Sequence, residues 1–288
     1  MKKNRSNIIL VLILLVGLSL ILYPSVSDTY NSFHQSRAIV RYAETVANIN
    51  AERYEAMWRS AEEYNARLAR SGIQWEPDEE QKQEYQSLLD VTGTGIMAYV
   101  EIPSIDCRLP IYHGTEEAAL QIAVGHLEGS SLPVGGESTH CLLSGHRGLP
   151  SAKLFTDLDQ LREGDLFLLR TLDETLTYEV DQIRVVMPYE LNELRIDPGL
   201  DLCTLITCTP YGVNSHRLLV RGHRIANVEA QTIRVTGDAF QIDSAVVAPV
   251  VAMPMLLVLL VLLLSRSRQR QRRREVLKRT EVRTDETK

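Results

Sequence analysis

The sequence predicts a mainly β protein, a small barrel or sandwich of seven or eight strands, preceded by a helical region and flanked by two membrane segments. Three observations support this fold class. After Gly95 the chain consists of short runs rich in Val, Ile, Leu and Tyr that Pro and Gly separate, as in strands joined by turns. Before Gly95 the apolar residues recur at steps of three to five, which indicates amphipathic helix. Near each end of the 288 residues lies one long apolar run.

Charge is distributed unevenly along the chain. The formal net charge is −6, but both ends are basic, and residues 24–244 alone hold 18 basic and 33 acidic side chains, a net charge of −15. So acidic a region repels phosphate groups, which excludes nucleic acid as a partner. Because 44% of the residues are hydrophobic, the chain can bury a sizeable core, which excludes a wholly disordered protein.

The two apolar runs are candidate membrane segments. Residues 8–22, behind Lys2 and Lys3, form a run of 15 that suits either a retained, tilted anchor or the core of a signal peptide cleaved near Ser27. Residues 245–264 form a run of 20, which at about 1.5 Å per residue spans roughly 30 Å of bilayer hydrocarbon. Six arginines follow it, so the positive-inside rule places the C-terminus in the cytoplasm and the acidic middle outside the cell membrane.

The helical region extends from residue 28 to residue 70. Asn48 to Asn50 interrupt its apolar pattern, which predicts two helices, and Ser71 with Gly72 is a typical helix end. The acidic stretch 74–90 then predicts a loop with one short helix.

The chain after Gly95 alternates strands with two short helices. The helices are expected at residues 116–123 and 152–161. The strands are expected at residues 96–102, 107–112, 139–144, 165–169, 175–187, 202–207 and 216–221.

Cys208 is the residue best suited to chemistry. None of the four cysteines lies in a CxxC or a Cys/His metal spacing, which argues against structural zinc. Cys208 follows the strand 202–207 and precedes a turn that begins with Thr209 and Pro210, where a thiol can meet both solvent and a base. A nucleophilic thiol needs a basic or cationic partner that favours the thiolate. His146 fits this requirement, because it follows another strand in a turn between two glycines.

The residues around Cys208 and His146 resemble those of a known family. The segment TLITC, which ends at Cys208, resembles the TLxTC signature of sortases, the cysteine transpeptidases of the Gram-positive cell surface. Residues 209–222 resemble class C, the pilus-building group, residues 143–147 (LSGHR) resemble the motif that carries the family's histidine, and residues 95–111 resemble its first strands. The resemblance covers about residues 35–225 and implies a sortase-type eight-stranded β-barrel with short helices.

Carried over by position, the resemblance implies three roles. Cys208 would be the nucleophile, His146 the acid/base partner, and Arg217 the cation that supports the substrate and the oxyanion. Residues 208 and 217 are nine apart on consecutive strands, so an antiparallel hairpin can bring them together. Arg221 shares the strand parity of Arg217 but lies farther from the turn, so it ranks second.

The resemblance also implies a reaction and its partners. Cys208 would attack the Thr–Gly bond of an LPXTG-type sorting signal and form a thioester, which an amine resolves. In class C enzymes the amine is typically a pilin lysine, so the product is an isopeptide-linked polymer. The alternatives are a sortase that attaches single surface proteins to the cell wall, a membrane-anchored cysteine peptidase, and a non-enzymatic membrane scaffold. No Gly-rich phosphate loop or metal-binding motif is evident in the sequence, so we expect no cofactor.

The helical region in class C sortases usually leads into a lid that bears an Asp-Pro-aromatic motif over the active site. The match fails here, because Trp75 and Asp78 flank Glu76 and Pro77 with the aromatic residue before the acid. Trp75 would still be able to cover Cys208, and Asp78 to pair with a basic residue. The alternative is an ordinary linker with one packed Trp.

These features predict seven segments. They are 1–27, a cytoplasmic start with the N-terminal anchor or signal segment; 28–72, the helical region; 73–94, the candidate lid or linker; 95–228, the catalytic β-barrel; 229–244, a linker; 245–264, a transmembrane helix; and 265–288, a basic cytoplasmic tail.

The remaining cysteines and histidines are expected to be structural. Cys141 and Cys203 each precede a candidate site residue by five positions, so both should face away from the site. If their strands are neighbours, the two thiols lie opposite each other, either as a disulfide or as two small buried thiols. The histidines expected in structural or surface positions are His34, His113, His126, His140, His216 and His223.

Overall fold

A computed structural model describes residues 2–227 of the chain, with side chains from residue 11 onward. The described residues fall into two compact units, one that ends at Val26 and one that begins at Ser27. The predicted transmembrane helix 245–264 and the basic tail that follows it lie outside the described residues.

Helix α1 (Lys2–Ala47) contains the first apolar run and continues through Ser25 and Ser27 without a break. Leu12, Val16 and Leu20 are all more than half exposed, although apolar side chains in water are more stable when they are buried. Within the described residues, Val11–Ala47 is the one helix long and apolar enough to cross a membrane by length and composition. An N-terminal membrane anchor accounts for both observations.

Two shorter helices follow α1. Helix α2 (Ala51–Ser71) begins where Asn50 accepts a hydrogen bond from the backbone N–H of Arg53, and it ends at Gly72, whose φ of 80° favours glycine. The predicted break and the predicted helix end are therefore confirmed. Helix α3 (Glu79–Ser87) is the short helix expected in the acidic stretch.

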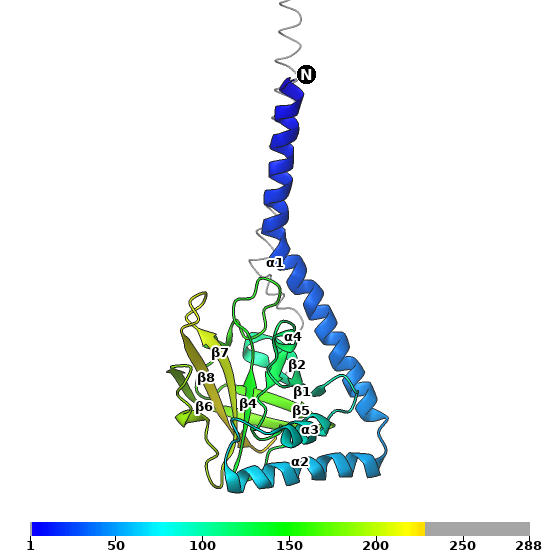
Figure 1. Cartoon of the computed structure of the whole chain (residues 1–288), viewed down its shortest axis with the longest axis vertical. Coiled ribbons are helices and arrows are strands. Elements are labelled where there is room, and N and C mark those ends of the chain that lie inside the picture. The colour runs from blue at the N-terminus through cyan, green and yellow to red at the C-terminus, as the bar shows by residue number, and fades with distance from the viewer. Residues whose placement is uncertain (1, 228–288) are drawn as a thin grey trace, which may run out of the picture. The chain divides into compact units, whose positions relative to one another are not determined.

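Eight strands close into a barrel in the order β1-β2-β3-β4-β7-β8-β6-β5 (Figure 1). The pairs β2/β3 and β4/β7 are parallel and the other six are antiparallel. The strands are β1 (Ile96–Ile102), β2 (Cys107–His113), β3 (Val124–His126), β4 (Thr139–Ser144), β5 (Leu166–Thr171), β6 (Glu174–Val186), β7 (Asp201–Thr209) and β8 (His216–Ile225). All seven predicted strands are present. Strand β3 was not predicted, because three residues that include a glycine carry no alternating pattern.

One of the two predicted barrel helices is confirmed and one is wrong. Helix α4 (Glu117–Leu120) lies within the predicted 116–123. The stretch 152–161 instead forms a series of turns that includes the 3-10 turn Leu158–Gln160. Phe155 and Leu158 are buried at a spacing of three, which imitates a helix, but Leu154 has a φ of 42° and the backbone N–H of Phe155 bonds the carbonyl of His146. Two further 3-10 turns are Pro103–Ile105 and Asn192–Leu194.

The inside of the barrel is filled with side chains. Val100, Phe167 and Tyr178 are each fully buried, and the rings of Phe167 and Tyr178 stack with their centroids 5.4 Å apart. Along β4, β7 and β8 the residues of this core alternate with a second buried cluster on the outer face, formed by Leu142, Leu194, Ile206 and Leu219. We call these four residues the outer cluster.

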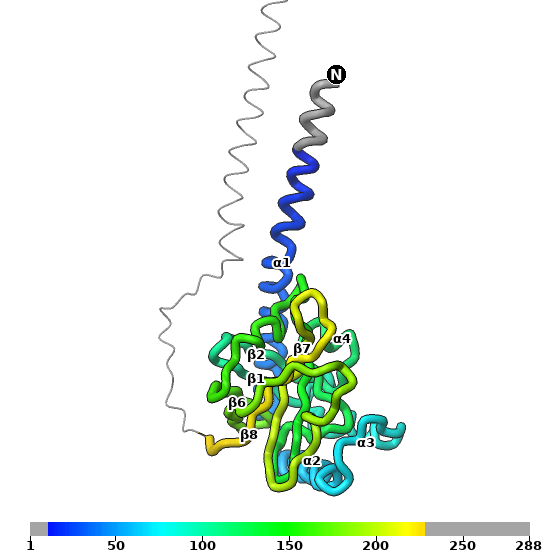
Figure 2. The backbone as a smooth tube through the Cα atoms, turned by 90° about the vertical axis from the view of Figure 1, so that its left-hand side faces the viewer, coloured from blue at the N-terminus to red at the C-terminus, as the bar shows by residue number. Residues whose placement is uncertain are grey.

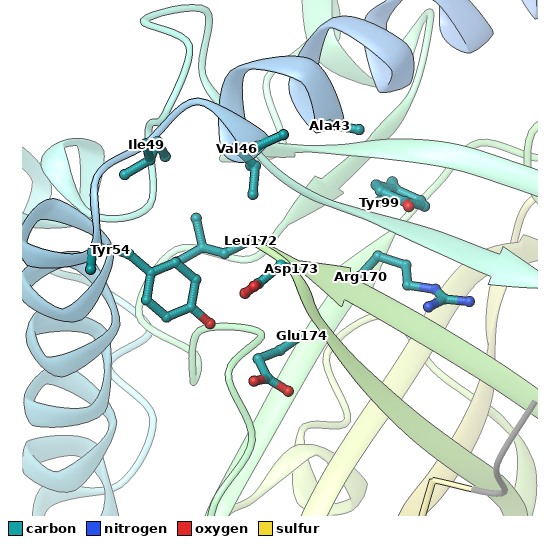
Figure 3. A pocket seen from close by; sticks show the side chains of 11 residues that line it. Ala43, Val46, Ile49, Tyr54, Tyr99, Arg170, Leu172, Asp173 and Glu174 are labelled. Atoms are coloured by element: carbon teal, nitrogen blue, oxygen red, sulfur yellow. The ribbon is translucent and has the colours of Figure 1, made fainter.

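From Asp28 onward α1 runs along the side of the barrel, where Asp28 accepts from the N–H of Lys153 and Asn31 donates to the carbonyl of Ser151. Helix α2 lies across the barrel end opposite the β7–β8 turn, and α4 lies at the same end as that turn (Figures 1 and 2). A cavity of about 530 Å³ opens where α1 meets α2 and the β5–β6 turn, with Tyr54, Leu172 and Asp173 around it (Figure 3). None of the candidate catalytic residues lines this cavity, so it is not the reaction site.

Tyr42 connects α1 to two strands of the barrel. Its fully buried hydroxyl donates to the carbonyl of Met97 at 2.8 Å and accepts from the backbone N–H of Leu172 at 2.7 Å. Tyr42→Phe leaves both backbone groups unpaired, so we expect it to lower the free energy of unfolding by about 1–3 kcal/mol. Chemical denaturation of the full chain in detergent measures this. Tyr189→Phe, at a ring that is 75% exposed, is the matched control and should have no effect.

Candidate active site

Cys208 lies one residue before the end of β7, on the outer face of the barrel. Cys203 and Leu205 belong to the inner core, whereas Ile206 belongs to the outer cluster, so alternation places Cys208 with Ile206. In the antiparallel β7/β8 pair the residue directly opposite Cys208 is Arg217. The hairpin therefore brings these two residues together, as their spacing predicts.

His146 reaches the same place through the parallel pairing of β4 with β7. Ser144 pairs with Ile206, and the backbone N–H of Gly145 then donates to the carbonyl of Ile206 at 3.0 Å. Thr207 closes the end of the ladder, since its buried hydroxyl donates to the carbonyl of Gly145 at 2.7 Å. Parallel strands advance together, so two residues beyond this pairing His146 comes level with Cys208.

The backbone around His146 is held by close packing. A Cβ atom on Gly145 would lie 2.7 Å from the ring of Phe155, so glycine is required there, and the N–H of Phe155 donates to the carbonyl of His146 at 3.1 Å. The His146 side chain is 28% exposed, and its Nε2 lies 3.6 Å from Oε2 of Glu117. The site thus has a fixed backbone beneath a partly open imidazole.

Arg217 and Arg221 differ in the charge that surrounds them. Arg221 is paired with Asp181 through two contacts of 3.0 Å, which neutralise its charge. Arg217 donates to the backbone carbonyls of His216 at 3.2 Å and Asn214 at 3.4 Å, and no carboxylate pairs with it among residues 2–227. Arg217 is therefore the cation opposite Cys208 that no carboxylate pairs with in the described residues.

Arg147 also contacts the site, a role that its sequence motif does not indicate. Its side chain is only 9% exposed; one guanidinium nitrogen donates to the hydroxyl of Thr209 at 3.2 Å and another pairs with Asp159. The residue after Cys208 is thereby tied to the loop that carries His146. The Gly-His-Arg-Gly sequence marked this loop, but spacing alone does not show where an arginine side chain points.

The other cysteines are poorly suited to attack a substrate: Cys141 is almost completely buried, and the thiols of Cys203 and Cys107 hold their protons. Cys141 and Cys203 lie directly opposite each other in the β4/β7 pair, buried and both as free thiols, as in the second of the two expectations. Burial raises the pKa of Cys203 well above its usual value. Burial likewise raises the pKa of Cys107 to about 12. Neither of these thiols forms thiolate readily near neutral pH.

Three of the other histidines have structural partners, as expected. His113 lies within 3.0 Å of the carbonyls of Gly95 and Leu88. His126 contacts the hydroxyl of Tyr85 at 3.0 Å. His140 lies between Arg195 and Thr204, and burial lowers its pKa to about 4, so it remains neutral at pH 7.

The candidate lid segment makes contacts of its own. Ile73 packs against the outer cluster, and the N–H of Gln74 donates to the carbonyl of Gly129 at 3.0 Å. Asp78 caps α3 by accepting from the N–H of Gln81, and it forms no ion pair within the described part of the chain. Trp75 is 40% exposed. A lid role for Trp75 and Asp78 stays a prediction.

Known proteins have similar sequences and a similar fold. The family model for the sortase domain matches residues 100–225. The structure resembles sortase C1 from Streptococcus agalactiae, with 52% sequence identity and a TM-score of 0.65 over 66% of this chain and 99% of that one. It also resembles Streptococcus pneumoniae sortase C, with 46% identity and a TM-score of 0.59 over 66% of this chain and 97% of that one.

A curated relative is more distant. Sortase A of Streptococcus agalactiae serotype III is 28% identical over 117 residues, which make up 40% of this chain and 47% of that protein. The chain thus matches about half the length of that relative. Together with the barrel order and the near-complete coverage of the two solved structures, these matches show that the chain belongs to the sortase family, whose members are cysteine transpeptidases.

Proposed function

We propose that this chain cleaves an LPXTG-type sorting signal between Thr and Gly and transfers the acyl group to a pilin lysine, so that it polymerises pili at the cell surface. The observation that supports the proposal is that Cys208 lies directly opposite Arg217 in the β7/β8 pair, while β4, whose end leads into His146, runs parallel to β7 beside them. The similar solved structures support class C, and the Streptococcus pneumoniae sortase C was described for its pilin substrate specificity.

In the acylation half of the reaction, the Cys208 thiolate attacks the carbonyl carbon of the threonine. A tetrahedral oxyanion forms, and the positive charge of the Arg217 guanidinium stabilises it. His146 then protonates the departing glycine amine as the C–N bond breaks. The product is a thioester on Cys208 and a free amine on the cleaved tail.

In the second half, His146 takes a proton from the incoming lysine amine, which attacks the thioester. A second oxyanion forms beside Arg217 and collapses, releasing the Cys208 thiolate and an isopeptide bond. One histidine is therefore acid in the first half and base in the second. No metal or organic cofactor enters either step.

The chain's topology suits such a reaction at the cell surface. The N-terminal apolar helix would anchor the protein, and the acidic domain would lie outside, with the predicted helix 245–264 returning the C-terminus to the cytoplasm. The segment 73–94 would lie between helices and barrel as a lid or linker. These boundaries are part of the proposal.

The full chain in detergent, mixed with an LPXTG-type peptide and a lysine-bearing pilin domain, tests the proposal by mass spectrometry. An isopeptide product that appears as a covalent ladder supports pilin polymerisation. Hydrolysed peptide alone would indicate a peptidase, and single attachments to a cell-wall amine would indicate an anchoring sortase.

Cys208→Ala should abolish both the thioester and the product, because no other described thiol lies at the site. We expect a loss of at least about 1,000-fold in kcat/KM, since the covalent route is closed. Cys107→Ala is the matched control and should keep most activity. Equal activity of the Cys208→Ala variant and the unmodified chain would refute a cysteine mechanism.

Arg217→Ala should lower kcat by about 100- to 1,000-fold while the protein stays folded, because one preorganised charge at the oxyanion is lost. Arg184→Ala, at an exposed arginine on the neighbouring strand β6, is the control and should change kcat little. Steady-state kinetics with the peptide and pilin domain measure both. A kcat unchanged by Arg217→Ala would remove Arg217 from the mechanism.

A further inference from the structure

We infer that Glu117 is a positioning residue for His146: its carboxylate holds the proton on Nε2 and leaves Nδ1 to exchange protons with the thiol and the amines. The inference deepens the proposed function, since it rests on His146 as the acid/base partner of Cys208. No role for Glu117 follows from the sequence motifs, which lie on β4, β7 and β8.

The contact between these residues involves an imidazole nitrogen that lacks any other partner. Nε2 of His146 is shielded from solvent and forms no hydrogen bond with another group in the described residues. The closest charged atom is Oε2 of Glu117, at 3.6 Å. This distance exceeds the roughly 2.7–2.9 Å of a charge-assisted hydrogen bond, and the Glu117 side chain is 71% exposed. Catalytic hydrogen bonds are often long before substrate binds.

The fold explains why Glu117 lies there. Strand β3 runs antiparallel to β4, with Gly125 opposite Ser144, so the residues that precede β3 lie beside those that follow β4. Helix α4 precedes β3 and carries Glu117 over His146. Gln121, one turn further along α4, donates to Oε1 of Glu117, which leaves Oε2 for the imidazole.

The chemistry follows from which nitrogen is occupied. With a proton held on Nε2, neutral His146 has its lone pair on Nδ1. The Cys208 Sγ–H proton moves to Nδ1, giving thiolate and imidazolium; Nδ1 then passes that proton to the glycine amine as the C–N bond breaks. The Nε2 proton stays in place throughout. A carboxylate that orients a histidine in this way also stabilises the imidazolium.

The other charges near His146 come from three elements. Cys208 is on β7 and Arg217 is on β8. Arg147 follows His146 in the same loop, and Asp159 pairs with it. Glu117 is the acid whose contact with the ring is direct. Because this carboxylate is largely exposed and water screens it, we expect an effect of about two- to fivefold rather than several orders of magnitude.

The test compares Glu117→Gln with Glu116→Gln in the full chain in detergent. Both remove one exposed acid from neighbouring positions, but no contact joins Glu116 to His146. The first measurement is the rate at which iodoacetamide alkylates Cys208, followed from pH 5 to 9 by peptide-resolved mass spectrometry, which needs no substrate. The second is kcat/KM for the sorting peptide over the same pH range.

We expect Glu117→Gln to slow alkylation of Cys208 about two- to fivefold at pH 7 and to move the imidazole-dependent limb of the kcat/KM profile to lower pH. Glu116→Gln should leave both the alkylation rate and the pH profile unchanged. Glu117→Asp keeps a carboxylate and should show a smaller change in both than Glu117→Gln. Alkylation and pH profiles identical to those of the unmodified chain would overturn the inference. So would a change confined to the KM for the acceptor amine, because Glu117 would then be a docking group for the amine.

The two proposals fail in different ways. If the proposed function is wrong, the Cys208→Ala variant keeps full activity or the unmodified chain transfers no acyl group. Failure of the Glu117 role shows in the alkylation profile, which is read whether or not transfer occurs.

Discussion

The parallel pairing of β4 with β7 is the constraint on which the site depends. Parallel neighbours advance in the same direction, so their C-terminal ends lie at the same level, and each end carries one of the two residues proposed to exchange a proton. The antiparallel β8 then returns past β7 and adds a cation. Three residues separated by as many as 71 positions are thereby brought to one edge by backbone hydrogen bonds alone, before any side chain contributes.

Several side chains make that edge rigid. The Thr207 hydroxyl closes the β4/β7 ladder, Phe155 fills the space that Gly145 leaves, and Arg147 ties Thr209 to the loop of His146. Each is buried or nearly so, and together they leave the backbone little freedom to move the reacting groups apart. Preorganisation of this kind reduces the reorganisation needed when a substrate binds.

The regular parts of the fold could be predicted because their sequence patterns are local. Short apolar runs between prolines and glycines indicated seven strands, and Asn50 and Gly72 indicated the ends of α2. Strand β3 has too few residues to show a period, and the spacing of Phe155 and Leu158 imitates a helix that the positive φ of Leu154 prevents. Motifs located Cys208, His146 and Arg217, whereas Glu117 and Arg147 act through side-chain direction across loops, which depends on tertiary contacts.

The packed barrel interior leaves the candidate site on the outside of the barrel, where large molecules can reach it. Phe167, Tyr178 and their neighbours leave no room inside, so Cys208 lies on a strand surface that faces outward rather than in an enclosed chamber. A folded protein of any bulk can therefore present an extended tail to the edge of β7 while a second one approaches from across it. The proposed joining of two folded proteins would need such an open surface, because both must reach Cys208 at once.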